Sequence, residues 1–328
     1  MNHSSVRGLP AVLALITAGL AGLLPDARAQ TVAPASSTPL RIVVPFPPGT
    51  AVDILARDLS SRLQPVLNRA VVVDNKAGAG GNIGTEHAAN AAPDGSTVLL
   101  TVNTTVNINP LIYTKIKYNP AVDLVPIASL SKSGYLLAAG PKFPYHSVQE
   151  LIAAARQKPD TLTYASYGNG TMAHVCMEQF QEVTGTRLRH VPFRGAFAPE
   201  LISGVVDVAF ENLAPSIPLV KDQRLTPLAV TYARVSALPD VPALSESVPN
   251  FECYAWAGIF APKGFPPALQ KQLSEQITQV VRSPGYVALA DRLGSIPAPM
   301  EHGEFVAFVR SDAEKWKKLI PPLNIKLD

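Results

Sequence analysis

Charged residues are scarce in this chain of 328 residues, since only 16% are Asp, Glu, Lys or Arg and the formal net charge is +3. Arg7, Arg28 and Asp26 contribute +1 of that value, which leaves +2 for residues 30–328. A charge this small, on scattered basic residues, is not typical of proteins that bind nucleic acid or a membrane surface. The chain also has no apolar run of transmembrane length after its first 30 residues. Nucleic acid is therefore not an expected partner.

The glycine-rich segment of the chain lacks the spacing of a nucleotide site. A dinucleotide-binding Gly-x-Gly-x-x-Gly beginning at Gly78 requires glycine at position 83, where the chain has Ile83. The Gly-Lys-Ser/Thr of a phosphate-binding loop is also missing. His174 and Glu178 have the four-residue spacing of a helical metal pair, but no second pair of ligands lies nearby in the sequence. We therefore expect no cofactor and no metal.

Motifs of hydrolytic enzymes are missing as well. The chain contains neither the Gly-x-Ser-x-Gly of a nucleophile elbow nor the His-Glu-x-x-His of zinc proteases. Ser166, His174 and Glu211 are the residue types of a catalytic triad, although nothing in their spacing requires them to meet. We predict that the chain is not an enzyme, and a secreted hydrolase built on Ser166 and His174 remains a minor alternative.

Cysteine is limited to Cys176 and Cys253, which permit one disulfide in an oxidising compartment. Cys176 lies on the apolar side of a predicted helix, and Cys253 lies in the apolar run 251–260. Both positions suit a small buried side chain. We favour two buried free thiols over a bridge, and the sequence leaves the disulfide open.

The N-terminus has the three parts of a secretory signal peptide. Arg7 supplies a positive charge, residues 9–24 form an apolar segment, and Ala27-Arg28-Ala29 provides a small-x-small cleavage site. The apolar segment is interrupted by glycine and proline, so it does not suit a membrane span. We predict a signal peptide over residues 1–29, cleavage after Ala29 and a periplasmic protein; the alternative is a buried first helix.

Two strand-to-helix turns near the start of the predicted mature chain could each bind an anion. Residues 42–44 predict a buried strand, and apolar residues from Val52 to Val66 recur at helical spacing just after Gly49. Residues 71–73 predict a second strand, followed by a glycine-rich loop over 75–84 and another helix. The N-terminus of a helix presents unpaired N–H groups at the positive end of its dipole. Together the two turns indicate a pocket for a carboxylate.

Strands and helices alternate further along the chain, which is typical of an α/β protein. Ser147 and Glu150 form a capping box before a helix that ends at Gln157, and Gly185 stops a helix over 171–184. Further strands are predicted over 161–166, 205–210 and 225–232, and two amphipathic helices over 269–281 and 305–319.

Several motifs follow one another in the order found in a known family. They are Pro45-Phe46-Pro47-Pro48-Gly49 with Asp53, Ala56 and Arg57; Asn75 with Gly78-Ala79-Gly80-Gly81 and Gly84; Pro93-Asp94-Gly95; Asn109-Pro110-Leu111-Ile112-Tyr113; Tyr164-Ala165-Ser166-Tyr167-Gly168-Asn169-Gly170-Thr171 with His174; His190-Val191-Pro192-Phe193-Arg194-Gly195; Leu228-Ala229-Val230-Thr231; Pro239-Asp240-Val241-Pro242; and Trp256-x-Gly258-x-x-Ala261-Pro262. This series resembles the substrate-binding proteins of tripartite tricarboxylate transporters, the Bug family. Thr50 and Tyr167 depart from the pattern, which usually has small residues there.

The resemblance implies a two-lobed periplasmic binding protein of the type II-like class. Each lobe would be a mixed β-sheet flanked by helices, with the ligand in the cleft between the lobes. Residues 38–130 and 253–328 would form one lobe and residues 131–252 the other, joined at crossing segments near 128–139 and 252–260. The implied function is capture of a small carboxylate-bearing organic acid by a monomer that delivers it to membrane transporter subunits. An extracytoplasmic sensor that presents the same complex to a signalling receptor is the main alternative.

The expected ligand-binding residues lie on loops of both lobes. In the first lobe they are Pro48, Gly49, Thr50, Asp53, Gly80, Gly81 and Asn82, and in the second Ser166, Tyr167, Gly168, Thr171, His174, Arg194, Phe210 and Glu211. Asp53 suits a helix start, where a carboxylate favours the dipole, and a contact with a ligand is its second possible role. Arg194 is equally suited to an anion or to the surface, and Glu211 suits a ligand hydroxyl or amine better than a carboxylate.

Overall fold

A computed structural model describes residues 38–193 and 195–328 together with Met1. The strands of the described part join in one sheet with the order β2-β1-β3-β9-β4-β7-β5-β6, while β8 and β10 pair with β4 outside this path. The strands are β1 (Leu40–Val44), β2 (Val71–Asn75), β3 (Thr97–Val102), β4 (Leu124–Ala139), β5 (Thr163–Ser166), β6 (Arg189–Pro192), β7 (Val208–Asn212), β8 (Thr226–Val230), β9 (Tyr254–Pro262) and β10 (Ile296–Met300).

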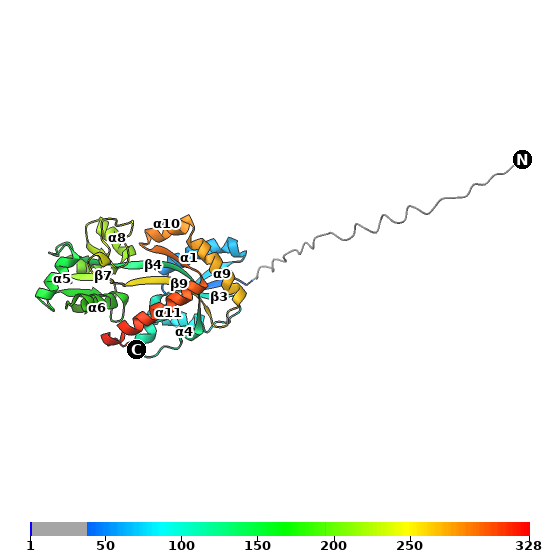
Figure 1. Ribbon diagram of the computed structural model, residues 1–328, viewed down its shortest axis with the longest axis horizontal. Helices are drawn as coiled ribbons and strands as arrows, with labels where there is room; N and C mark the ends of the chain where they lie inside the picture. The colour runs from blue at the N-terminus through cyan, green and yellow to red at the C-terminus, as the bar shows by residue number, and fades with distance from the viewer. Residues whose placement is uncertain (2–37, 194) are drawn as a thin grey trace. The chain divides into compact units, whose positions relative to one another are not determined.

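The long strand β4 belongs to two groups of strands (Figure 1). Its residues up to Gly134 pair with β9, whereas Tyr135 to Ala139 pair with β7. A Cβ on Gly134 would lie 3.0 Å from a methyl carbon of Val230 and 3.1 Å from the backbone nitrogen of Tyr232, so the change of partners occurs where the chains pack tightly. β4 covers the first predicted crossing segment and β9 most of the second. The lobe boundaries themselves stay a prediction.

Helices cover both faces of the first group of strands. Ile42 and Val44 pack with α1 (Ala51–Leu67), α9 (Pro267–Val281) and α10 (Pro284–Arg292). Val43 points to the other face and packs with residues of α2 (Asn82–Ala89) and α11 (His302–Leu319). Successive side chains of a strand point to opposite sides, so one run of valine and isoleucine supplies two cores.

The second group of strands is also covered on both faces. α5 (Val148–Gln157) and α6 (Met172–Thr184) pack on one side, and α7 (Ala198–Ser203) and α8 (Leu213–Lys221) on the other. The remaining helical segments are short: η1 (Ala79–Gly81), η2 (Thr104–Ile108), α3 (Asn109–Ile112), α4 (Pro120–Asp123), η3 (Leu244–Glu246) and η4 (Pro321–Leu323). Among the described residues, no helix combines the length and the apolar character needed to cross a membrane.

Local sequence signals placed several helix ends correctly. The Ser147 hydroxyl accepts the N–H of Glu150, and Gly185 ends α6 in the left-handed conformation, with a φ of 61°. The apolar stripe of α1 was predicted one turn too long, because Val66 is 46% exposed. Helix α10 and strand β10 were not predicted.

Cys176 and Cys253 form a disulfide, with their Cα atoms 5.6 Å apart. The prediction of two free thiols is therefore wrong. Both cysteines belong to the same buried core, next to Phe180 and Phe251. Tertiary packing brings α6 against the segment before β9, a contact between residues 77 positions apart that local sequence cannot reveal.

Candidate functional site

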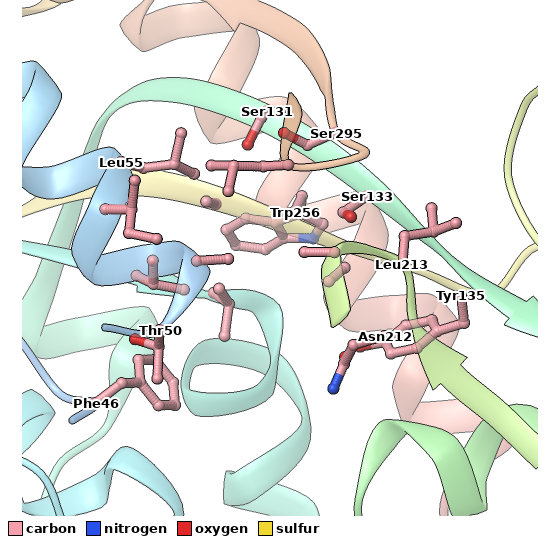
Figure 2. A pocket seen from close by; sticks show the side chains of 18 of the residues that line it. Phe46, Thr50, Leu55, Ser131, Ser133, Tyr135, Asn212, Leu213, Trp256 and Ser295 are labelled. Atoms are coloured by element: carbon pink, nitrogen blue, oxygen red, sulfur yellow. The ribbon is translucent and has the colours of Figure 1, made fainter. Parts of the chain in front are cut away.

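A cavity of about 620 Å³ is lined by residues from both groups of strands. Figure 2 shows Phe46, Thr50 and Leu55 on one side of it, Asn212, Leu213 and Tyr135 on another, and the ring of Trp256 between them. The lining residues are Phe46, Gly49, Thr50, Ala51, Val52, Ile54, Leu55, Val102, Thr104, Ser131, Ser133, Gly134, Tyr135, Asn212, Leu213, Ala214, Pro215, Ala255, Trp256, Ala257, Leu293 and Ser295. Among these residues there is no Asp, Glu, Lys, Arg or His.

The turn that leads into α1 is fixed by the carboxylate of Asp53. One carboxylate oxygen accepts the N–H of Gly49 and the Nε of Arg57, both at 2.9 Å, and the other accepts the side-chain amide of Asn75 at 2.9 Å. Burial raises the pKa of Asp53, but these hydrogen bonds outweigh it and hold the pKa below its usual value. Asp53 is 2% exposed and lies outside the cavity lining, which supports its helix-start role.

This turn directs the start of α1 at the cavity. The Thr50 hydroxyl caps the helix by accepting the N–H of Asp53 at 3.4 Å. The N–H groups of Ala51 and Val52 have no acceptor among the described residues. Both residues line the cavity, so α1 presents free donors and the positive end of its dipole there.

A second helix start faces the same cavity from the other group of strands. Asn212, Leu213 and Ala214 all line it, and Asn212 precedes α8 without a capping bond from its side chain. The N–H groups of Leu213 and Ala214 likewise have no acceptor in the described part of the chain. Sequence reasoning missed this site, whose only signal is the Asn-Leu-Ala-Pro that follows a predicted strand.

The glycine-rich loop lies behind the cavity wall. Asn82 accepts hydrogen bonds from the side chains of Asn109 and Tyr118 at 2.6 and 2.9 Å. A Cβ on Gly81 would lie 2.6 Å from the Thr105 methyl group and 3.4 Å from the ring of Phe46. Gly81 therefore packs against Phe46, which lines the cavity, whereas Gly80, Gly81 and Asn82 themselves lie outside the lining.

The loop after β5 is held by its own hydrogen bonds. Ser166 is fully buried, with its hydroxyl 2.6 Å from Nε2 of His190, and it accepts the N–H of Gly168 at 3.1 Å. The N–H of Gly170 donates to Nδ1 of His174 at 3.1 Å. The Thr171 hydroxyl donates to the carbonyl of Gly168 at 2.8 Å. These predicted site residues lie outside the cavity lining.

Two imidazoles stack beneath this loop, with the ring centroids of His174 and His190 4.3 Å apart. Burial lowers the pKa of each to about 4, and for His190 the neighbouring imidazole adds to the effect. Both rings are therefore neutral at pH 7, and they stabilise the loop as packed side chains.

The half-buried Tyr167 donates its phenol hydroxyl to the buried carboxylate of Glu211 at 2.5 Å. Burial raises the pKa of Glu211, and the bond from Tyr167 offsets part of that rise. Phe210 is fully buried in the core. Of the remaining predicted residues, Pro48 is exposed and lies outside the lining, one position before the lining residue Gly49, and Arg194 lies outside the described residues.

The three residues of the triad hypothesis do not contact one another. Ser166 contacts His190 instead of His174, whose Nδ1 accepts a backbone N–H, and Glu211 is bonded to Tyr167. Within residues 38–193 and 195–328, no group of three or more His, Cys, Asp and Glu side chains has an arrangement suited to a metal ion.

The wall of the cavity includes Trp256, which the sequence analysis did not select. Its indole Nε1 donates to Asp312 at 2.9 Å, and the same carboxylate oxygen accepts from Trp316 and Asn107 at 3.0 and 2.8 Å. The indole N–H is thereby used inside the protein, so the ring offers apolar surface to the cavity. Ser131, Ser133 and Tyr135, alternate residues of β4, add hydroxyls to the lining.

Comparison with known proteins gives a consistent result. Residues 55–325 match the family model "Tripartite tricarboxylate transporter family receptor". The chain is 33% identical over 298 residues to "UPF0065 protein in tcbD-tcbE intergenic region" of Pseudomonas sp. (strain P51), which covers 89% of this chain and 88% of that protein. It is 31% identical over 294 residues to "Protein BugT" of Bordetella pertussis, covering 88% and 90%.

Two similar solved structures are both about 30% identical in sequence. "R. palustris Rpa4515 with adipate" has a TM-score of 0.76 and 30% identity, covering 87% of this chain and 96% of that one. "Structure of periplasmic binding protein BugD" has a TM-score of 0.73 and 29% identity, covering 88% and 98%. These similarities confirm the predicted fold class, a two-lobed periplasmic binding fold.

Proposed function

The chain belongs to the tripartite tricarboxylate transporter receptor family, and from this premise we propose that it captures a small carboxylate-bearing organic acid in the periplasm and delivers it to a membrane transporter of the tripartite tricarboxylate type. Residues 1–29 would direct export and be removed after Ala29; apart from Met1 they lie outside the described residues. In this proposal the protein binds its ligand without chemical change.

The observation that carries the proposal is the pair of helix starts at one cavity. α1 and α8 each present unpaired N–H groups there, from the two groups of strands. Each helix N-terminus is equivalent to about half a positive charge, and N–H groups form strong hydrogen bonds with a carboxylate. An acid would therefore contact both groups of strands at once.

Two further findings support this function. The cavity lies beside β4 and β9, the two strands proposed to cross between the lobes, so closure about them would enclose a ligand. The similar protein Rpa4515 is described with adipate, a dicarboxylate. A carboxylate ligand for this chain agrees with both.

A thermal-shift screen of the purified mature protein tests the binding step, with mono-, di- and tricarboxylates, aromatic acids and amino acids as ligands. A ligand that binds only the folded state should raise its stability by about 2.7 kcal/mol at a concentration one hundred times its Kd. Neutral amide analogues of each acid are the matched controls. The proposal fails if no acid raises the melting temperature, or if the amide analogues do so equally.

Uptake measurements test the delivery step. Membrane vesicles that contain the membrane subunits of a tripartite tricarboxylate transporter from the same organism should accumulate a labelled acid only when the binding protein is added. If the acid binds but is never accumulated, and the complex instead binds a sensor kinase, then the alternative role of an extracytoplasmic sensor is correct.

A further inference from the structure

The cavity lining, as far as the structure describes it, offers no acceptor of full negative charge to a ligand. The two carboxyl groups nearest to it in the chain are those of Asp53 and Glu211, and neither lines it. Both oxygens of Asp53 accept hydrogen bonds from the protein, and the carboxylate of Glu211 is bonded to Tyr167. Among the described residues, a ligand ammonium group would therefore have only neutral acceptors as partners: hydroxyls, backbone carbonyls and the side-chain amide oxygen of Asn212.

The part of the lining that comes from residues 38–193 and 195–328 also contains no cationic side chain. Lys132 lies on β4 between two lining residues, but its Nζ is directed to the other side, 4.6 Å from the ring of Phe308 and 5.2 Å from that of Tyr254. Arg57 is used by Asp53 and Asn75. Among the described lining residues, the positive potential comes from the helix starts, about half a charge from each of α1 and α8.

Most of the remaining wall is hydrocarbon. Phe46, Val52, Leu55 and Leu213 line the cavity, and Trp256 offers its ring because its N–H bonds to Asp312. Such a surface favours an apolar ligand body, which leaves water on binding.

From these observations we infer that the ligand is a mono- or dicarboxylic acid without an amine, with a hydrocarbon or aromatic body, and that amino acids and tricarboxylates are rejected. This inference rests on the proposed function and narrows its substrate class.

The rejection has two electrostatic causes. An ammonium group would lose water, find no carboxylate and lie in the positive potential of two helix starts, and burial of an unpaired charge is very unfavourable. A tricarboxylate carries three negative charges against roughly one positive charge from the two helices. One or two carboxylates match the available donors.

Isothermal titration with matched ligands tests the inference on the mature protein. The pairs are glutarate with glutamate and 3-phenylpropanoate with phenylalanine, which differ only by the amine, and glutarate with citrate. We expect at least one acid of these pairs to bind, and its partner to bind at least about a hundredfold more weakly, since an unpaired buried charge costs more than the 1–3 kcal/mol of an unpaired neutral group.

A charge added to the wall provides the second arm. Ser133→Asp places a carboxylate in the cavity lining and should shift the affinity ratio of each pair toward the amino acid by at least tenfold. Ser61→Asp adds the same charge at an exposed position of α1, outside the lining, and should leave the ratio unchanged. Circular dichroism tests whether both variants are folded. If Ser133→Asp is unfolded, the wild-type titrations of the matched ligands test the inference.

The possible results separate this inference from the function on which it rests. Glutamate, phenylalanine or citrate binding within tenfold of its matched acid overturns the inference and leaves the proposed function standing. Equal ratio shifts in Ser133→Asp and Ser61→Asp overturn the location of the ligand in this cavity. No binding by any carboxylate overturns the proposed function, and the inference with it.

Discussion

Replacing Asp53 by alanine should both destabilise the protein and weaken its binding of acids. The Asp53 side chain is 3% exposed, and it accepts hydrogen bonds from Gly49, Arg57 and Asn75. Net hydrogen bonds to a charged group contribute about 1.5–3 kcal/mol each, but Gly49 and Arg57 lie at the surface, where water replaces the lost acceptor. We therefore expect a loss of about 2–4 kcal/mol in the free energy of unfolding.

The effect on binding follows from the position of the turn. Asp53 fixes the backbone of Gly49 and thereby the direction of the free N–H groups of Ala51 and Val52. Without the carboxylate these donors are no longer preorganised, and we expect at least tenfold weaker binding of the best acid, about 1.4 kcal/mol. Urea unfolding and isothermal titration measure the two effects.

Asp58→Ala is the matched control on the same helix. Asp58 pairs with Arg62 through two bonds of 2.7 and 2.9 Å, but its side chain is 21% exposed and lies away from the cavity lining. Surface pairs contribute about 0–1 kcal/mol, so stability should change little and affinity not at all. If Asp53→Ala and Asp58→Ala lower stability and affinity equally, the role we give to Asp53 is wrong.

Three further predictions concern the supporting structure. The double variant Cys176→Ala with Cys253→Ala should lower the free energy of unfolding by about 4 kcal/mol, because the bridge closes a loop of 77 residues. Reduction of the wild-type disulfide is the control. A loss under about 1 kcal/mol would contradict the estimate. The free energy of unfolding should fall as the pH drops from 6.5 to about 4, because in this range the unfolded state protonates His174 and the folded state does not. In His174→Gln the total fall over this range should be smaller by up to about 3 kcal/mol. An equal fall in both proteins would refute the assignment. Gly81→Val should lower the free energy of unfolding by about 2 kcal/mol more than Gly185→Val does, and it should also weaken acid binding. Both glycines have a positive φ, but only at Gly81 would a Cβ clash, because it would lie 2.6 Å from a threonine methyl group. Equal losses for the two variants in urea unfolding would exclude this effect.

Sequence alone determined the local elements and the class of fold. The apolar run from Ile42 to Val44 indicated β1, the helical spacing of apolar residues after Gly49 indicated the start of α1, and Gly185 indicated the end of α6. These signals depend on bonds and dihedral angles within a few residues of each other. The family was also recognised from motif order, and residues 55–325 confirm it.

Tertiary structure decided which of these elements face the cavity. Both glycine-bearing loops start helices, yet of the predicted site residues that the structure describes only Gly49 and Thr50 reach the lining, and the second helix start there is α8. Phe46 lies between the cavity and Gly81, a contact that depends on how α2, β1 and η2 pack.

The same limit explains the other corrections. Cys176 meets Cys253, and Ser166 meets His190 instead of His174, because separate elements pack at angles and distances that residue spacing does not encode. A helix start or a cysteine can be identified from its neighbours in sequence. The partner that it faces depends on the whole core.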